Sequence, residues 1–516
     1  MVALASPMRI AGWFVALLLA VLAVANPIAF GTRIADASYP SLLGAGSTWV
    51  SIALDQWRAD IAHQGFLINY KANGSSAGRN LYINGGVDFA ASEIPFQPDE
   101  LNELNNSSIP RHWQYIPDVA GGTSLMYNLH APSGNRITTL RLDADSAAKI
   151  FTGRITSWAD PEIVALNPGL HIRETRMIPV IRSDGSGTSA QFSLYLADQA
   201  PGVWGAFASA QGCPAPCSLW PPFNGSINAN GSDSVANFVA NDVLGSGAIG
   251  YVEAGYAYGR GFPVASLHNA SNNYTQPTSQ NVATALTHAT LYSDLTQNLT
   301  QVYRAPESNA YPMSSYSYMI LPCVAPPTAS PTCSTAPVPN FDAGKGFVLG
   351  TWIIYIACAG QREAAPLGYS PLPPNLVKAD LDAVNRLPGH PPTPPVDYNH
   401  CPNPTLYRGG GGSSSSGPAS SNAPTTSNGS TSVAPGTGNT TGVIADTGQA
   451  VPPGAARVTL AGSAARTRLL NTALAAAAGA DGPSHRPLWI ALLVLLLVVF
   501  TPAVIGMARR RRKGSG

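Results

Sequence analysis

A dense set of hydrogen-bond donors lies in residues 180–196, which read VIRSDGSGTSAQFSLYL. The guanidinium of Arg182 and the carboxylate of Asp184 stand directly before a run of Gly, Ser and Thr residues. An apolar run comes first, and Phe192 and Tyr195 follow at helical spacing, so a strand is expected to turn into a helix here. The first amides of a helix lack partners and lie at the positive end of its dipole. Together these residues could bind an anion.

Two other stretches, LLGAGSTWV (residues 42–50) and NYKANGSSAGRNL (residues 69–81), have the same design. Each follows an apolar run and precedes a helix-like pattern, which after the first stretch places Val50, Leu54 and Trp57 on one face. Ser or Thr at a helix start often only caps it, and one such turn alone favours that interpretation. Three in one chain, one of them with an arginine, favour a shared anion site.

The motifs of common phosphate chemistry are missing from these turns. None ends in the Gly-Lys-Ser/Thr of a P-loop, and Ser186 is not in a G-x-S-x-G elbow because Asp184 stands where the first glycine should be. None of the nine histidines is tied to Ser186 by its spacing, and H-E-x-x-H does not occur. We therefore expect no catalytic residues, no metal ligands and no cofactor. A phosphate-ester hydrolase stays open only through Ser186 itself.

The N-terminal region predicts export. Arg9 precedes an apolar run from Ile10 to Ala25, and Ala35-Asp36-Ala37 forms a cleavage site of the A-x-A type. This pattern indicates a signal peptide over residues 1–37, with an uncleaved anchor as the alternative. No cysteine precedes Cys213, so a lipoprotein anchor is not expected.

A second apolar segment predicts a membrane anchor at the other end of the chain. Residues 487–508 contain an apolar run of about 20 residues, the length of a single transmembrane helix. The basic tail at 509–516 places that end in the cytoplasm, so the residues before the helix are expected outside the cell. A sortase signal would look similar, but no LPxTG motif precedes the segment. The expected location is the cell membrane, with one crossing.

Between these ends the composition changes once. Residues 38–405 alternate strand-like apolar runs with helical patterns, which predicts an α/β domain with largely parallel sheets and two lobes. Residues 406–486 are rich in Gly, Ser, Thr, Pro and Ala and predict a disordered linker. The formal net charge is only +1, so nucleic acid is not an expected partner.

Six cysteines in an exported chain indicate disulfides. Proximity in the sequence suggests the pairs 213–217, 323–333 and 358–401 among fifteen possible pairings. A zinc site built from four cysteines is the alternative, which the irregular spacing and the oxidising compartment disfavour.

Five motifs carry a family resemblance. GAGSTW, GSSAGRN, VDFAASEIP, RSDGSGTS and GAIGYVE occur in the order and spacing of the phosphate-binding proteins of Pst-type ABC importers, and the resemblance covers roughly residues 42–387. It implies a type II periplasmic-binding-protein fold, with two α/β lobes and a ligand cleft between them. It also implies that the protein is a monomer, with inorganic phosphate as its ligand and an ABC permease as its partner.

The resemblance further implies that all three turns donate hydrogen bonds to one phosphate. The implied donors are the Thr48 hydroxyl, the Trp49 amide, Ser75, Arg182, Ser186, Gly187 and Thr188. Asp184 would pair with Arg182 and temper its charge. Lobe one would hold Thr48, Ser75 and Glu93, and lobe two Arg182, Ser186 and Thr188. The crossover strands are expected near TSLMYNL and just after YVEAGYA.

Two positions depart from the family pattern. Glu93 in AASEIP replaces the family's aspartate, the acceptor that rewards the proton of monohydrogen phosphate and repels fully ionised sulfate. Glu93 keeps that acceptor on a longer side chain. Trp49 replaces a phenylalanine, and its bulkier indole is expected to narrow the entrance or to stack on a group attached to the phosphate.

The leading hypothesis is an extracellular, membrane-anchored binding protein that captures inorganic phosphate for an ABC importer and closes its lobes around it. A surface phosphate sensor, or an interaction module without a transport role, is the alternative. The hydrolase remains the third possibility.

Overall fold

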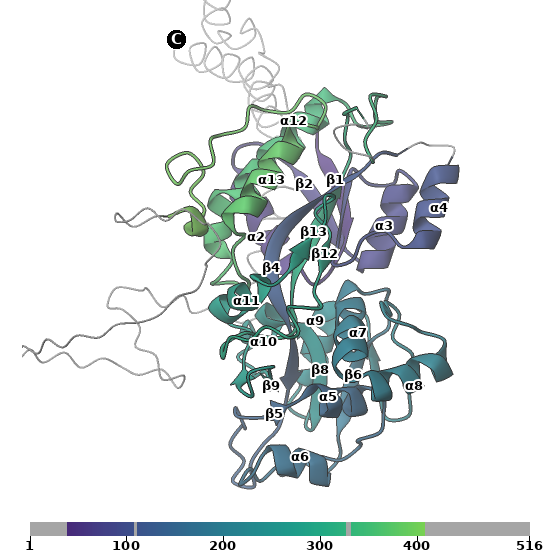
Figure 1. Ribbon diagram of the computed structural model, residues 1–516, viewed down its shortest axis with the longest axis vertical. Helices are drawn as coiled ribbons and strands as arrows, with labels where there is room; N and C mark the ends of the chain where they lie inside the picture. The colour runs from purple at the N-terminus through teal and green to yellow at the C-terminus, as the bar shows by residue number, and fades with distance from the viewer. Residues whose placement is uncertain (1–38, 108–110, 327–331, 408–516) are drawn as a thin grey trace, which may run out of the picture. The chain divides into compact units, whose positions relative to one another are not determined.

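The computed structural model describes residues 39–107, 111–326 and 332–407 (Figure 1). Contacts divide the chain into a unit over Met1–Gly417 and a second over Pro418–Gly516, and all described residues lie in the first. The predicted signal peptide, transmembrane helix and basic tail lie outside the described residues, as does the linker from residue 408 on. Within the described part of the chain, no helix has the length and apolarity needed to cross a bilayer.

One mixed sheet of eight strands passes through both lobes in the order β2-β1-β3-β13-β4-β8-β6-β7. The strands are β1 (Leu42–Gly46), β2 (Ile68–Ala72), β3 (Phe89–Ser92), β4 (Gln114–Tyr127), β6 (Ile178–Arg182), β7 (Ile227–Ala229), β8 (Ala248–Glu253) and β13 (Ser314–Leu321). Pairing is parallel among β1, β2 and β3 and among β6, β7 and β8, as predicted. It is antiparallel where β13 and β4 enter, so the prediction of largely parallel sheets holds only for the outer strands.

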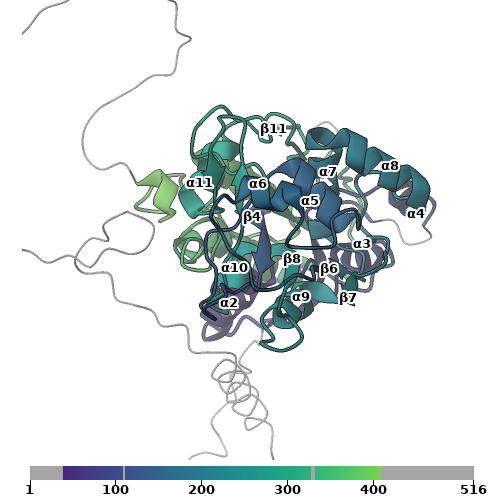
Figure 2. The same cartoon turned by 90° about the horizontal axis from the view of Figure 1, so that it is seen from below.

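Helices cover both faces of this sheet in each lobe and bury its central strands on both sides, whereas Asn69, Lys71 and Ala72 of the edge strand β2 are exposed (Figure 1). Lobe one carries α2 (Ser51–Ala62), α3 (Ser75–Ile83), α4 (Pro98–Asn106), α12 (Ala343–Ala357), α13 (Pro374–Val384) and the 3₁₀ turns η1 (Ala359–Glu363) and η2 (Pro404–Leu406). Lobe two carries α5 (Ala144–Phe151), α6 (Pro161–Leu166), α7 (Gly187–Gln199), α8 (Pro201–Gln211), α9 (Gly231–Val239) and α10 (Ala254–Tyr258). Viewed from below, α7 and α9 lie on opposite sides of β6 and β8 (Figure 2).

Smaller elements fill the segment between β8 and β13. They are β9 (Ser266–His268), β10 (Tyr274–Thr275), α11 (Ser279–Leu286), β11 (Thr290–Leu291) and β12 (Gln297–Asn298), and β9 also pairs with β5 (Arg141–Leu142). The predicted first crossover near TSLMYNL is confirmed, since these residues continue β4. The prediction of the second just after YVEAGYA is wrong, because the chain returns to lobe one only along β13. Apolar patterns indicate strands, but they do not indicate which lobe a strand joins.

Strand β4 is the common element of the two lobes. All 14 of its residues are buried; Gln114–Gly122, except Asp118, pair with β13, and Thr123–Tyr127 pair with β8. The change of partner occurs between Gly122 and Thr123. A Cβ on Gly121 would lie 2.5 Å from the indole ring of Trp49, so glycine permits this close approach of lobe one to the crossing strand.

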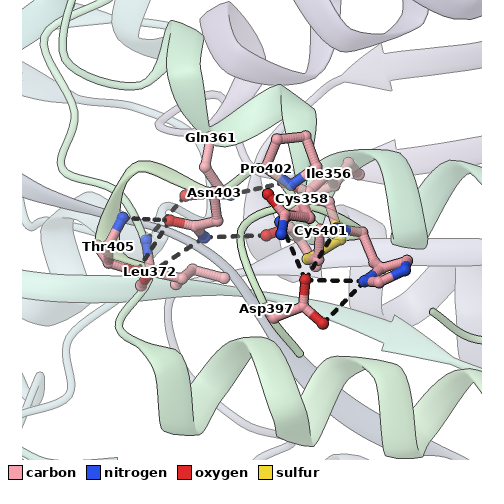
Figure 3. Close-up of a disulfide and its surroundings, with 12 residues drawn as sticks. Ile356, Cys358, Gln361, Leu372, Asp397, Cys401, Pro402, Asn403 and Thr405 are labelled. Carbon is pink, nitrogen blue, oxygen red and sulfur yellow. Dashed lines mark hydrogen bonds and ion pairs between the residues drawn. A yellow bond between two sulfur atoms is a disulfide. The ribbon is translucent and has the colours of Figure 1, made fainter. Parts of the chain in front are cut away.

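The six cysteines form the three predicted disulfides, 213–217, 323–333 and 358–401, so no thiolate remains for the alternative zinc site. Around Cys358–Cys401, the buried Asn403 side chain donates to the carbonyls of Ala357 (2.9 Å) and Leu372 (3.3 Å) (Figure 3). Gln361 accepts from the Leu372 amide at 2.8 Å and donates to the Asp118 carbonyl of β4 at 2.9 Å. These contacts tie the last described residues to the crossing strand.

The disulfides should differ in how much they stabilise the fold. Cys358–Cys401 spans a sequence separation of 43 and Cys213–Cys217 one of only 4. Loop-closure entropy then gives about 4 kcal/mol for the first and about 2 kcal/mol for the second. We expect Cys358→Ser with Cys401→Ser to lower the free energy of unfolding in urea by the larger amount. Cys213→Ser with Cys217→Ser is the matched control, and equal losses would contradict the expectation.

Candidate functional site

The three predicted turns meet where the lobes face each other. Thr48 follows β1, Ser75 begins α3, and residues 182–188 connect β6 to α7. The Gly187 amide of lobe two donates to the Ser75 hydroxyl of lobe one at 3.1 Å. The Ser76 amide donates to the Gly185 carbonyl at 3.0 Å. The predicted convergence and the predicted division between lobes are therefore observed, with the lobes in direct contact.

Arg182 is buried at this meeting point, and the nitrogens of its guanidinium donate hydrogen bonds in two directions. Its Nε donates to Asp184 Oδ1 at 2.7 Å, and Nη2 donates to Oδ2. Burial alone would raise the pKa of Asp184, but the hydrogen bonds and charge of Arg182 more than offset it, so the pKa is lowered. The remaining nitrogen, Nη1, donates to Ser232 Oγ at 3.1 Å and to Thr188 Oγ1 at 3.4 Å. One arm of the cation thus faces hydroxyls of the cleft.

A fourth turn, which the sequence analysis missed, completes the arrangement. At the start of α9, just after β7, Ser232 places its hydroxyl 2.9 Å from that of Thr48, and its amide donates to Thr48 Oγ1 at 3.2 Å. Asp184 fixes this turn by accepting from the Gly231 amide at 2.9 Å. The sequence NGSDS carries the same Gly-Ser signal as the other turns, but β7 has only three residues, too few to be recognised as a strand.

Glu93 is the buried acceptor of the site. Ser75 Oγ donates to its Oε2 at 2.8 Å, while Ser47 Oγ and, at 3.3 Å, Ser317 Oγ donate to Oε1. Burial raises the pKa of Glu93, although the hydroxyls of Ser47 and Ser75 and the charge of Arg182 act in the opposite direction. The carboxylate therefore points into the contact between the lobes, as predicted. Ser47 and Ser317 are further residues that the sequence analysis did not single out.

Gly187 allows α7 to approach that carboxylate. A Cβ at this position would lie 1.9 Å from Glu93 Oε2, so any side chain would push the two lobes apart. Glycine is required here for close contact, and the first amide of α7 is aimed at lobe one.

Ser186 is the N-cap of α7. Its Oγ accepts from the Ser189 amide at 3.1 Å, so the capping role that a Ser at a helix start suggests is present. A hydroxyl has one hydrogen and two lone pairs, so this cap leaves its hydrogen available for donation. Capping and ligand binding are therefore compatible at this residue.

The expectation for the Trp49 indole is wrong. The ring turns inward, donates from Nε1 to Thr123 Oγ1 at 3.3 Å and packs edge-on against Tyr369, with ring centroids 5.5 Å apart. It is almost fully buried beside Gly121, so it neither narrows an entrance nor stacks on a ligand. The Trp49 amide donates to Ser47 Oγ at 3.0 Å.

The described residues contain no group of three or more His, Cys, Asp and Glu side chains arranged to hold a metal ion. What the geometry offers is a set of donors from both lobes with one buried carboxylate among them. Such a site can hold an oxyanion by hydrogen bonds to hydroxyls, amides and one guanidinium.

Comparisons with known proteins show the family to which the chain belongs. Residues 31–347 match the family described as the PBP superfamily domain. The phosphate-binding protein PstS of Xylella fastidiosa (strain Temecula1) is 31% identical over 340 residues, which cover 65% of this chain and 82% of that protein. Phosphate-binding protein PstS 2 of Mycobacterium tuberculosis (strain H37Rv) is 29% identical over 359 residues, covering 67% of this chain and 87% of that protein.

Solved structures show the same fold. The X-ray structure of a human phosphate binding apolipoprotein matches with a TM-score of 0.50 at 16% identity, covering 68% of this chain and 100% of that chain. The fold predicted from the sequence, the type II periplasmic-binding-protein fold, is therefore confirmed for the two lobes.

Proposed function

The chain belongs to the Pst-type phosphate-binding proteins of the PBP superfamily, and from this membership we propose that its cleft captures inorganic phosphate. The observation that carries the proposal is the meeting of Arg182 Nη1, hydroxyls of both lobes and the Glu93 carboxylate in one buried place. The protein acts as a binding protein rather than as an enzyme.

Phosphate oxygens accept hydrogen bonds from donors in both lobes. In lobe one the donors are Thr48, the Trp49 amide and Ser75, and in lobe two they are Arg182, Ser186, Gly187 and Thr188. The contacts between Ser75 and Gly187 and between Thr48 and Ser232 support this assignment, because each consists of groups that can re-pair with a bridging anion. A ligand that bonds both lobes favours the closed arrangement.

Glu93 sets the selectivity. A carboxylate accepts a hydrogen bond from the P–OH of monohydrogen phosphate, whereas fully ionised sulfate brings only acceptors to it. The Ser47 and Ser317 hydroxyls support this role, because they continue to hold the carboxylate in one orientation when the Ser75 hydrogen turns to the anion.

We further propose that the protein works outside the cell on a single membrane anchor and delivers phosphate to the permease of an ABC importer. The support for export is the sequence of residues 1–37, and the support for anchorage is the sequence of residues 487–508. A surface sensor that keeps the same cleft is the second candidate.

Replacing the arginine should abolish tight binding. Arg182→Ala removes the charged donor and leaves Asp184 buried without its partner, so we expect phosphate affinity to fall at least about 100-fold, or about 2.7 kcal/mol. Isothermal titration calorimetry of the purified protein measures this, with thermal melts to verify folding. Arg260→Ala, which breaks a more exposed pair with Asp233 in the same lobe, is the control and should leave affinity unchanged. Equal affinity in the two variants would contradict the assigned cleft.

Neutralising the acceptor should relax selectivity. Glu93→Gln presents an amide that can donate to a sulfate oxygen, so phosphate affinity should fall and sulfate affinity should rise. Competition of the two anions in calorimetry gives the ratio, which we expect to drop by about tenfold or more. Glu253→Gln is a matched control, because that glutamate is equally buried and caps α10 through the Gly255 amide at 2.7 Å. An unchanged ratio in Glu93→Gln would exclude the acceptor role.

An assay of phosphate uptake distinguishes the proposed transport role from the proposed sensor role. In a strain that lacks its other phosphate-binding proteins, the full chain should restore growth and labelled phosphate uptake at low phosphate, and Arg182→Ala should not. A full chain that binds phosphate but restores no uptake would favour the sensor.

A further inference from the structure

A second buried acid, Asp118 of β4, lies close to Glu93. In the pairing of β4 with β13, Ser317 opposes Val119 and Tyr318 opposes Pro117, so Asp118 is the extra residue of a β-bulge. Its side chain is fully buried. Bulges redirect a side chain out of the regular alternation, and here the carboxyl comes to lie beside Ser317.

Ser317 connects the two acids. Its Oγ lies 3.3 Å from Glu93 Oε1 and 3.4 Å from Asp118 Oδ2. The other oxygen, Asp118 Oδ1, has no hydrogen-bond partner among the described residues. A hydroxyl carries one hydrogen and cannot satisfy two ionised acceptors at once. One of the two carboxyls must therefore supply a second hydrogen if both contacts are to be hydrogen bonds.

The surroundings favour Asp118 as the carboxyl that carries this hydrogen. Glu93 accepts from three serine hydroxyls and faces the cation of Arg182. Asp118 has no comparable set of donors, and burial, followed by the charge of Glu93, raises its pKa well above the usual range. The other titratable groups facing the pair add no second cation: they are Tyr70 on β2, Tyr369, and Asp380 on α13, whose pKa values are likewise raised by burial.

We propose that Asp118 is a positioning residue of the cleft. It carries a proton and is linked to Glu93 through the Ser317 hydroxyl in a chain of two hydrogen bonds, which we call the relay. The Asp118 O–H donates to Ser317 Oγ, and the Ser317 hydroxyl donates to Glu93 Oε1. Glu93 then stays ionised and has no hydrogen to offer, so a fully ionised anion finds no donor there. The inference rests on the proposed capture of phosphate and adds a residue to its selectivity.

The relay makes binding depend on pH in one direction. Asp118 supports binding in its neutral form, so phosphate affinity is highest below the folded pKa of this acid and falls as pH rises through it. Loss of the proton would place a second negative charge beside Glu93 and the bound anion. If binding requires that one proton, the dissociation constant should rise by up to about tenfold per pH unit on the alkaline side.

Asp118→Asn tests this dependence, because an amide donates to Ser317 but cannot ionise. We expect phosphate affinity within about twofold of wild type at pH 7, and a wild-type to variant ratio of dissociation constants that rises with pH. The titration of phosphate itself cancels in this ratio. Asp380→Asn is the matched control, since it replaces a neighbouring buried acid whose carboxyl oxygens have no hydrogen-bond partner among the described residues, and it should follow wild type.

An infrared difference spectrum, wild type minus Asp118→Asn, reports the proton directly. It should contain the band of a protonated carboxyl at pH 7. An ionised Asp118 at pH 7, or loss of its proton without a change in the ratio, would overturn the relay.

Ser317→Ala gives a test at neutral pH alone. It removes the bridge and leaves both acids, so we expect the preference for phosphate over sulfate to fall at least about fivefold. Ser315→Ala on the same strand is the control, since this buried hydroxyl has no hydrogen-bond partner among the described residues. An unchanged preference in Ser317→Ala would overturn the relay while the proposed function stands. Absence of phosphate binding by the wild-type protein would instead overturn the proposed function.

Discussion

The cleft depends on how the hydrogen-bond donors of the Arg182 guanidinium are distributed among their partners. Asp184 takes two of its nitrogens, so the closed lobes do not bury an uncompensated cation. The same aspartate holds the Gly231 amide and thereby positions the turn that carries Ser232. This one buried ion pair thus sets both the electrostatics of the cleft and the position of its fourth turn. The third nitrogen of the guanidinium is left to face the space where the lobes meet.

Around this cation the lobes touch mainly through hydroxyls and amides. Ser75 and Thr48 in lobe one meet Gly187 and Ser232 in lobe two. A hydroxyl both donates and accepts, so such contacts can exchange partners without leaving a buried polar group unpaired. An apolar interface of the same area would hold the lobes together whatever lay between them. The polar interface makes the balance between open and closed sensitive to what the cleft contains.

Local chemistry made part of this arrangement predictable. The three Gly-Ser turns, the position of Glu93 after a strand and the disulfides 213–217 and 323–333 follow from residues close together in the sequence, and the pair 358–401 follows because those two cysteines remain. The missed features depend on distant partners. The inward turn of Trp49 requires the space that Gly121 provides, and the place of Asp118 requires a bulge that exists only once β13 has paired with β4. The return along β13 could not be read from periodicity, because many residues that pack elsewhere separate it from β8.

The attachment of the C-terminal segment has a mechanical consequence. Through Gln361, Leu372 and Asn403, the last described residues are fastened to β4, the strand that both lobes share. A pull on the chain beyond Tyr407 would therefore be transmitted through these hydrogen bonds to the strand that both lobes share.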